Sequence, residues 1–439
     1  MSYRTFFLVA GLLLTGCADH RPEPLPGVVL VIVDTARADH FGIDGYPRNT
    51  TPNFDRLAED GAWYGNAWSQ SPWTLPSIAS ILTGQLPSVH GAGMVDGSLH
   101  SLRSGIPTLG ERLREHQFQT GAVMNVVFCN PASGLDRGFE SYDFRTSDAS
   151  NRGHRNAAAT TDAALGWVSQ VTDRPFFLLV HYFDAHLTYD PPEPFDTLFL
   201  ETGTEPIPRG FGSAEQVMAL RDGSIPMTPQ QRQALVARYD GELRFLDQEF
   251  GRLRTGLQAL GRWDDSMIVV VGDHGEEFWD HGGFEHGHSH HRELLRVPLI
   301  VRTPGGEPGA HRAERVRQID ILPTVLAHLG IPSSDDLPGQ VLGTGHAERS
   351  IAEGSLWAGN LVSVRTDDGT LILNRDTGEA HLYGPEDPME TRELPADTTG
   401  LVRKLGAVLP QGEENHDGDT VWTPDAEEIE RLRSLGYIQ

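Results

Sequence analysis

From residue 28 onward, short apolar runs alternate with longer amphipathic stretches. Continuous apolar runs of this length are typical of strands that are buried on both faces of a sheet. They occupy residues 28–34, 121–127, 175–183, 267–273 and 297–302. The amphipathic stretches predict helices, among them about 53–63 and 108–117. The pattern therefore predicts an α/β fold with a mostly parallel central sheet flanked by helices.

The most clearly delimited helix begins near residue 228. Thr228 is the predicted N-cap, Pro229 takes the first helical position and Gln231 completes a capping box. The apolar residues that follow keep steps of three and four: Leu235, Tyr239, Leu243, Leu246, Phe250, Leu253, Leu257 and Leu260. One face of this long helix is therefore expected to pack on the sheet.

Past about residue 345 the chain changes to short alternating segments separated by Asp-Gly and Thr-Gly turns. These segments, at 361–366, 370–375 and 380–384, predict a small antiparallel sheet. A last helix at about 425–435 would turn Ile429, Leu432 and Leu435 toward the body. We expect a main domain over residues 28–345 and a small packed C-terminal subdomain over 346–439.

The N-terminus has the features of a secretion signal. Arg4 precedes an apolar run, 6–14, that is too short to span a bilayer. The run ends in Leu-Thr-Gly-Cys17, which resembles the bacterial lipobox, where the cysteine becomes the lipidated first residue of the mature protein. An ordinary signal with a chance cysteine is the alternative.

This N-terminus predicts where the protein is located. Residues 1–17 would be a lipoprotein signal peptide, Cys17 the lipid anchor and 18–27 an extended Pro-rich tether. We expect the rest of the chain to lie in the periplasm or at the cell surface, on the outer membrane in a Gram-negative cell. No transmembrane helix is expected elsewhere.

The net charge of the chain excludes some classes of binding partner. The chain has 61 acidic and 35 basic side chains, a formal net charge of −26. Such a surface repels phosphate backbones and anionic lipids, so we expect no nucleic-acid partner and membrane contact only through the lipid anchor. Nothing in the sequence indicates an obligate protein partner. Two cysteines cannot form a disulfide framework, and Cys129 is predicted to be a buried or semi-buried spectator thiol.

Two predicted strands end in side chains that bind metals. Asp34 ends the first run, and Asp273 and His274 follow the run 267–273. Ligands of open α/β sheets bind beyond the carboxyl ends of the strands. Two carboxylates with an imidazole favour zinc or manganese, with calcium or magnesium less suited to the imidazole. A cap or turn role for a lone aspartate is the competing interpretation.

A hydroxyl lies just ahead of another predicted helix, in the stretch 73–84. Thr74 comes first, and Ser77 is placed to cap the helix. The positive potential of a helix N-terminus favours an alkoxide and an incoming anionic ester. A bound metal would make Thr74 a stronger nucleophile, whereas the simpler alternative is that Thr74 is an N-cap.

Six stretches, taken together and in this order, resemble the sulfatase-like branch of the alkaline phosphatase superfamily. They cover residues 34–91, 181–192, 272–282, 293–301, 318–331 and 381–394. The resemblance implies an alkaline phosphatase-like fold and a metal-dependent hydrolase acting on ester bonds, with its catalytic domain in residues 28–345. It further implies that Asp34, Thr74, Asp273 and His274 bind the metal, that Thr74 is the nucleophile, and that His186 and His286 contact the transferring group.

Two departures from the family pattern bear on the chemistry. Sulfatases have Cys or Ser, followed by x-Pro-Ser-Arg, where this chain has Thr74 and ends the motif in Ile78; a threonine cannot give the formylglycine aldehyde. The usual Asp-Asp pair is Asp34-Thr35. These differences favour phosphoryl chemistry on a small anionic ester, a phosphodiester or phosphonate monoester. The alternatives are a sulfatase using unmodified threonine, a phosphoethanolamine-type transferase, and a non-catalytic glycan-binding surface lipoprotein.

A histidine-rich stretch follows the predicted metal ligands. It contains His281, His286, His288, His290 and His291. Some of these, His288 among them, could hold a second metal or the substrate together with Asp184 or His186. The alternative is that only His286 enters the site. His90 is predicted to be structural.

Overall fold

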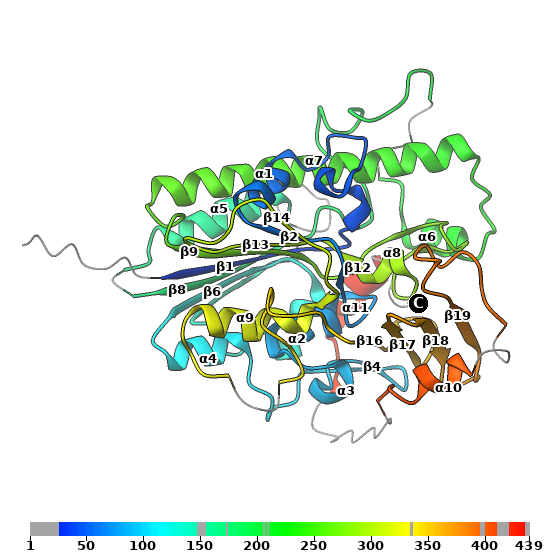
Figure 1. The fold of residues 1–439 in the computed structure, drawn as a ribbon. Helices are drawn as coiled ribbons and strands as arrows, with labels where there is room; N and C mark the ends of the chain where they lie inside the picture. The colour runs from blue at the N-terminus through cyan, green and yellow to red at the C-terminus, as the bar shows by residue number, and fades with distance from the viewer. Residues whose placement is uncertain are drawn as a thin grey trace, which may run out of the picture.

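The computed structural model describes residues 26–146, 155–172, 174–204, 207–208, 210–333, 337–395, 400–410 and 421–434. Its centre is an eight-stranded sheet of order β14-β2-β13-β9-β1-β8-β6-β7 (Figure 1). Four parallel strands form the middle: β9 (Ser266–Gly272), β1 (Gly27–Val33), β8 (Phe176–Tyr182) and β6 (Gln119–Met124). Every residue of β1, β8 and β9 is buried, as the continuous apolar runs predicted.

The sheet is completed by shorter strands at its two edges. On one side β7 (Ser141–Phe144) pairs in parallel with β6. On the other, β13 (Leu299–Arg302) is antiparallel to β9 and to β2 (Ala62–Tyr64), which pairs in parallel with β14 (Ala310–Arg312). The predicted α/β class with a mostly parallel sheet is therefore confirmed, with an antiparallel part at one edge.

Three elements differ most from the sequence prediction. The run 297–302 is not one strand, because Pro298, which has no N–H for the ladder, separates β12 (Arg296–Val297) from β13. β12 instead joins β3 (Ala67–Trp68), which also pairs with β15 (Val316–Arg317). The predicted helix at 53–63 ends earlier, since α1 (Pro52–Asp60) stops before Gly61. The strand expected at 121–127 is β6, which begins and ends earlier.

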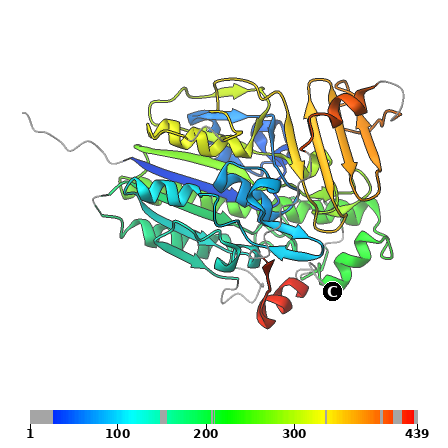
Figure 2. The same ribbon diagram turned by 90° about the horizontal axis from the view of Figure 1, so that it is seen from below.

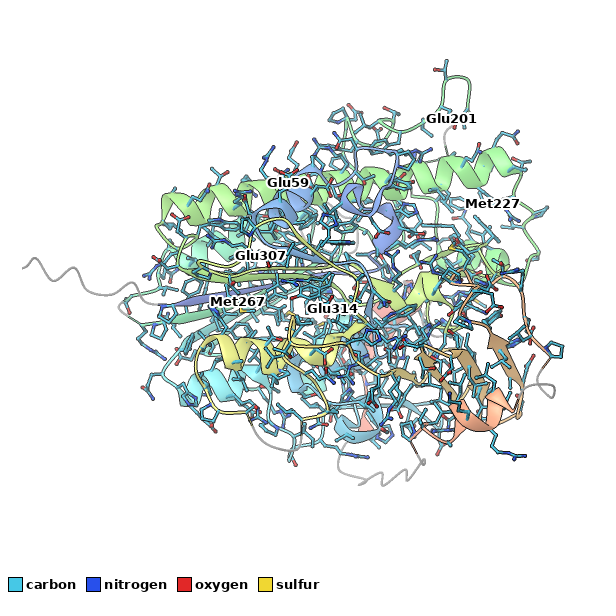
Figure 3. The ribbon with its side chains drawn as sticks, in the orientation of Figure 1. Glu59, Glu201, Met227, Met267, Glu307 and Glu314 are labelled. Atoms are coloured by element: carbon cyan, nitrogen blue, oxygen red, sulfur yellow. The ribbon has the colours of Figure 1, made fainter. Side chains whose placement is uncertain are left out.

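Helices cover both faces of the sheet (Figure 1). One layer contains α1, α5 (Ala157–Val168) and α7 (Pro229–Ala259), and α7 begins with the predicted capping box at Thr228. The other layer contains α2 (Thr74–Thr83), α4 (Leu109–Glu115) and α9 (Ile321–His328). Side chains fill the space between the layers, with Met267 buried in the sheet and Glu59 exposed at the periphery (Figure 3).

The C-terminal part forms the predicted antiparallel sheet, with one strand more than expected. Its strands are β16 (Ser350–Glu353), β17 (Leu361–Thr366), β18 (Gly369–Asn374) and β19 (Ala380–Tyr383), covered by α10 (Leu401–Gly406). This sheet lies beside the carboxyl ends of the parallel strands (Figures 1 and 2). The catalytic-domain and subdomain boundaries predicted at 345 and 346 stay predictions.

Shorter elements lie in the connections. They are α3 (Pro87–His90), α6 (Ala214–Arg221), α8 (Arg292–Leu295), β4 (Gly93–Val95), β5 (Ser98–His100), β10 (Glu277–Phe278), β11 (Phe284–Glu285) and β20 (Val421–Trp422). The last helix is α11 (Ala426–Ser434); Leu432 is buried in the main core as expected, whereas Leu435 lies outside the described residues.

The predicted signal peptide 1–17, Cys17 and nearly all of the tether 18–27 also lie outside the described residues. Within the ranges that the structure describes, no helix combines the length and apolar character needed to cross a membrane.

Candidate active site

Three neighbouring strands place a metal-binding type of side chain on the same face of the sheet. Asp34, His181 and Asp273 each follow, by two residues, an apolar residue of the core on which α2 packs. Because side chains alternate along a strand, all three continue that face. All three are fully buried, and their ligand atoms lie within 4.8 Å of one another. They form a group that could hold a metal ion.

Within the described residues, several buried atoms of this group have no hydrogen-bond partner. These are both carboxylate oxygens of Asp34, Oδ2 of Asp273 and both ring nitrogens of His181. His181 Nε2 lies 3.2 Å from Asp34 Oδ2, although no hydrogen bond joins them. In contrast, Asp273 Oδ1 accepts from the backbone N–H groups of Thr35 and His274, which aims Oδ2 at the group.

His274 adds a further ring nitrogen to the same space. Its Nδ1 lies 3.0 Å from the carbonyl oxygen of Gly275, so this nitrogen carries the hydrogen and Nε2 presents a lone pair. Nε2 is 3.4 Å from Asp273 Oδ2 and 3.7 Å from Asp34 Oδ1. Lone pairs facing one another in a buried site are costly unless a cation lies between them. The residues therefore fit a divalent metal.

Burial and neighbouring charges shift the pKa values of these side chains. Burial raises the pKa of Asp34 and of Asp273 well above their usual range, and for Asp273 the neighbouring Asp34 charge adds to the effect. Burial also lowers the pKa of His181 to about 4 and that of His274 well below its usual value. The imidazoles are therefore neutral, which is the form that binds a metal, whereas the two carboxyl groups need a nearby cation to favour their ionised form.

Thr74 is the first residue of α2 and is buried. Its Oγ1 lies 3.3 Å from His274 Nε2, so the hydroxyl faces the metal-binding group. The N-cap is Trp73, and no side chain caps this helix. Ser77 was expected to cap it, but Ser77 lies in the first helical turn and donates instead to the carbonyl oxygen of Asp273, 2.5 Å away. This bond ties the helix of Thr74 to the end of β9.

His186 and His286, predicted to contact the transferring group, lie next to His274. The His286 ring centroid is 4.5 Å from that of His274 and 4.9 Å from that of His186. His286 Nδ1 lies 2.9 Å from Glu276 Oε1, and the Tyr189 hydroxyl donates to Glu276 Oε2 at 2.7 Å. Burial raises the pKa of Glu276 to about 7 and lowers those of His186 and His286 well below their usual value.

Two residues of this site were missed by the sequence analysis. His181 is a single imidazole in a strand otherwise made of apolar and aromatic residues, and a polar side chain in a strand buried on both faces was the signal available. Glu276 follows the predicted ligands His274 and Asp273, but its contact with His286 depends on the fold of β10 and β11.

Among the described residues, Asp184 and His288 do not belong to one group of potential metal-binding side chains. Asp184 Oδ1 accepts from the backbone N–H of Ala157 at the start of α5, and His288 Nε2 lies 2.7 Å from Glu277 Oε2. Of the histidine-rich stretch, His286 enters the site described above. His290 instead lies between β17 and a loop, bonded to Ser363 Oγ and the carbonyl oxygen of Gly354.

His90 and Cys129, for which no role in catalysis was predicted, are both buried. His90 is buried, with Nε2 3.0 Å from Ser80 Oγ and Nδ1 accepting from the N–H of Ala92. Burial lowers the pKa of His90 to about 3, so the ring is neutral. Cys129 is a buried free cysteine, as predicted.

Comparison with known proteins indicates the family of the chain. The family profile described as Sulfatase matches residues 26–331. The chain is similar to the arylsulfatase of Clostridium perfringens, with 26% identity over 369 residues that cover 70% of this chain and 76% of that one. It is also similar to the choline-sulfatase of Rhizobium meliloti, with 24% identity over 366 residues, 71% of this chain and 69% of that one.

A solved structure shares the fold. The phosphonate monoester hydrolase of Agrobacterium radiobacter superposes with a TM-score of 0.70 at 19% identity, covering 87% of this chain and 94% of that one. The family profile extends over the strands and helices that bring together Asp34, Thr74, His181 and Asp273. The protein therefore belongs to the sulfatase family and is a hydrolase that acts on ester bonds.

Proposed function

We propose that the protein is a metal-dependent hydrolase of phosphate-type esters, phosphodiesters or phosphonate monoesters, with Thr74 as its nucleophile. The observation that carries this proposal is the buried Thr74 hydroxyl at the start of α2, 3.3 Å from His274 Nε2. The helix N-terminus favours the negative charge that develops there. Threonine at position 74 and Ile78 in place of arginine support phosphoryl over sulfuryl transfer, because neither precursor of formylglycine is present.

The metal would be held by four side chains, those of Asp34, Asp273, His181 and His274. Their mixture of carboxylate and imidazole donors favours zinc or manganese over calcium or magnesium. When bound, such an ion stabilises an ionised hydroxyl and the charge that develops on the phosphoryl oxygens. This set differs in two ways from the one implied by resemblance: it includes His181, whose Nε2 lies 3.2 Å from Asp34 Oδ2, and it leaves Thr74 with the role of nucleophile alone.

The side chains then have distinct tasks. Thr74 Oγ1, after losing its hydroxyl proton to solvent, attacks phosphorus in line, and the bond from phosphorus to the alcohol oxygen on the opposite side breaks. His286, with His186 beside it, is placed to protonate that leaving oxygen. Burial keeps the free His286 ring neutral, while an anionic ester in the site and Glu276 behind Nδ1 favour its protonated form.

Water then cleaves the phosphothreonine, releasing Thr74 for another cycle. An alcohol acceptor in place of water would make the enzyme a transferase. We further propose that the reaction takes place outside the cytoplasm, with the protein anchored through Cys17. Replacement of Cys17 by serine is expected to shift the protein from the membrane fraction to the soluble extracytoplasmic fraction.

The nucleophile is tested by comparing wild type with Thr74→Ala and Thr74→Ser. Three substrates are assayed in parallel: bis(4-nitrophenyl) phosphate, 4-nitrophenyl phenylphosphonate and 4-nitrophenyl sulfate. We expect kcat/KM to be highest for one of the two phosphorus esters, with Thr74→Ala losing about a thousandfold or more and Thr74→Ser retaining part of the activity. Metal content and circular dichroism of Thr74→Ala should be unchanged.

Mass spectrometry of the quenched reaction should find a phosphoryl or phosphonyl adduct on the Thr74 peptide. Retained turnover in Thr74→Ala would overturn the nucleophile assignment. Dominant cleavage of 4-nitrophenyl sulfate would instead favour a sulfatase that works with unmodified threonine. Equal binding of anionic glycans by metal-free protein, with no turnover of any ester, would favour the non-catalytic binding protein.

A further inference from the structure

His286 lies between two residues whose backbone is in the left-handed region. The φ of Glu285 is 74° and that of Gly287 is 80°. Glycine suits this conformation, and a Cβ at position 287 would also lie only 2.9 Å from the Cβ of Leu356. At position 285, in contrast, a side chain is present, and such a residue is disfavoured at positive φ unless its surroundings hold it there. The conformation of Glu285 therefore needs a group that holds it.

The carboxylate of Glu285 forms an ion pair with Arg221, the last residue of α6. The Glu285 side chain is fully buried, whereas that of Arg221 is partly exposed. Within the described residues, neither carboxylate oxygen of Glu285 accepts a hydrogen bond, so the ion pair is what compensates its charge. Removing one partner of a buried pair leaves an uncompensated charge, which is strongly destabilising. The pair therefore fixes the side chain of Glu285 and, with it, the backbone that leads into His286.

Arg221 is itself held in place by the protein around it. Helix α6 packs against β11, and its residues Val217 and Leu220 are buried in the core. The Arg221 guanidinium lies 4.4 Å from the centroid of the Trp357 ring, which is a cation–π distance. Nε1 of Trp357 in turn donates to the carbonyl oxygen of His286 at 3.2 Å. Arg221 thus contacts both the carboxylate that precedes His286 and the indole that is bonded to its carbonyl oxygen.

The position of the His286 ring depends on this backbone. His286 Nδ1 lies 2.9 Å from Glu276 Oε1, and the chain is brought back to Glu276 by the pairing of Glu285 with Glu277 in β11 and β10. Each of these strands has only two residues, and so short a pair of strands has little stability of its own. A change of φ at Glu285 would redirect the chain just before His286. Contacts from outside the two strands are therefore needed to keep His286 beside Glu276.

We propose that Arg221 is a positioning residue of the active site. It holds Glu285 in the left-handed conformation and thereby keeps His286 beside Glu276, where His286 meets the leaving oxygen. Helix α6, which lies far from the metal ligands in the sequence, is then a required part of the catalytic arrangement. This inference rests on the proposed role of His286 as the acid that protonates the leaving oxygen.

The main test compares Glu285→Ala with Glu285→Gly. Both variants remove the ion pair, and the partly exposed Arg221 can then turn to solvent, but only glycine takes a φ of 74° without steric cost. The substrates are phenyl phenylphosphonate, whose leaving oxygen needs a proton, and 4-nitrophenyl phenylphosphonate, whose leaving group departs without one. We expect Glu285→Ala to lose about tenfold or more in kcat/KM with the phenyl ester and little with the 4-nitrophenyl ester, whereas Glu285→Gly keeps most of the activity with both.

A second comparison changes Arg221. Arg221→Gln leaves the buried carboxylate of Glu285 unpaired and should give the same selective loss, together with a lower melting temperature. Addition of Glu285→Gly should restore both properties, because no carboxylate then needs a partner and glycine accepts the backbone conformation. Arg232→Gln is the matched control: Arg232 lies 4.3 Å from the ring centroid of Trp279, at an exposed position of α7, and its replacement should leave both esters unaffected.

Equal losses in Glu285→Ala and Glu285→Gly would overturn the inference, and so would a failure of Glu285→Gly to restore Arg221→Gln. A raised KM with unchanged kcat in Arg221→Gln, not corrected by Glu285→Gly, would show that Arg221 binds the substrate instead. Should Arg221→Gln fail to fold, the comparison at position 285 decides the question by itself, because it leaves Arg221 in place.

Failure of the proposed function gives different results. If the wild type cleaves the two corresponding sulfate esters and neither phosphonate ester, the phosphoryl chemistry is wrong, and the same variants are compared with the sulfate esters. If His286→Gln slows both esters equally, His286 is not the acid. The positioning by Arg221 then predicts that Glu285→Gly exceeds Glu285→Ala in kcat/KM with either ester, and a ratio near one overturns it.

Melting temperatures cover the case in which no ester is cleaved. Glu285→Ala should melt at a lower temperature than Glu285→Gly, because only alanine is strained at positive φ. Equal melting temperatures would show that the ion pair does not hold a strained backbone and would overturn the inference.

Discussion

Two groups of side chains in the described part of the chain have the donor types and spacing of a metal site. They are the active-site group, Asp34, His181 and Asp273, and a peripheral group, His281, His291 and Glu293. Atoms of the first group lack hydrogen-bond partners within the described residues. In the peripheral group His281 bonds Glu293 through Nδ1 and the carbonyl oxygen of Glu390 through Nε2, both at 2.7 Å. Donor type and spacing alone therefore do not identify a metal site.

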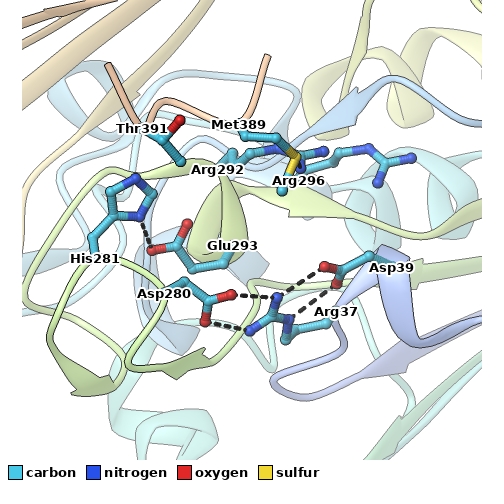
Figure 4. Close-up of a pocket in the computed structure, with 9 residues that line it drawn as sticks. All are labelled: Arg37, Asp39, Asp280, His281, Arg292, Glu293, Arg296, Met389 and Thr391. Atoms are coloured by element: carbon cyan, nitrogen blue, oxygen red, sulfur yellow. Dashed lines mark hydrogen bonds and ion pairs between the residues drawn. The ribbon is translucent and has the colours of Figure 1, made fainter. Parts of the chain in front are cut away.

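The two groups differ in what supplies the positive charge. Burial disfavours the charge of His281, but the hydrogen bond and negative charge of Glu293 outweigh it, and the pKa of His281 rises to about 9. A proton on His281 thus supplies the positive charge that a metal would supply in the active-site group. Nearby, in a pocket lined by His281 and Glu293 as well, Arg37 likewise pairs with both Asp39 and Asp280 (Figure 4).

The largest expected effect is that of Asp273→Asn. Losing a carboxylate that faces the proposed ion should lower turnover by about a thousandfold or more, because several kcal/mol of charge stabilisation disappear. Metal analysis should find little bound ion, and the metal-free variant should melt at a higher temperature than metal-free wild type, since carboxylate repulsion is removed. Glu293→Gln is the matched control and should keep full metal content. Normal metal content in Asp273→Asn would contradict the site.

His181→Gln should have the next largest effect. We expect the metal affinity to fall by about 10- to 100-fold, with activity recovering at high metal concentration. Titration of zinc or manganese into chelator-treated protein, followed by turnover, measures this. His290→Gln, which changes a buried histidine bonded to Ser363 and Gly354, should leave the titration curve unchanged. Identical curves for wild type and His181→Gln would remove His181 from the ligand set.

A smaller and more selective effect is expected for Glu276→Gln. If Glu276 favours the protonated form of His286, the variant should slow esters with poor leaving groups by about 10- to 100-fold, since these need a proton on the departing oxygen. Esters of 4-nitrophenol, which leave without a proton, should be cleaved almost normally. The slope of log kcat/KM against leaving-group pKa reports the difference. Parallel slopes for both proteins would show that Glu276 only supports the structure.

The smallest effect on activity is expected for His281→Gln, which should leave turnover and metal content unchanged. The raised pKa of His281 means that the folded state binds this proton more tightly than the unfolded state. Stability from His281 is therefore complete below pH 6.5 and is lost as pH rises through about 9. Thermal unfolding at pH 6 and pH 10 should show a larger decrease for wild type than for His281→Gln. Equal decreases would contradict the assignment.

Much of the fold follows from local patterns. The runs that form β1, β8 and β9 were predictable because a strand covered on both faces has apolar residues throughout. The start of α7 was predictable because its capping box is made by residues three apart. The short edge strands could not be predicted, because β2 and β14 depend on pairing with distant segments more than on their own sequence.

For the site, local patterns were enough to predict the candidates Asp34, Asp273 and His274, because parallel strands deliver their carboxyl ends to one edge. Which polar atoms have hydrogen-bond partners could be read only from the folded chain. His281 is neutralised by Glu293 from a neighbouring segment, whereas Thr74 and His274, 200 residues apart, meet within 3.3 Å. A metal-binding group is recognised by acceptors that lack donors, and that property depends on contacts across the whole chain.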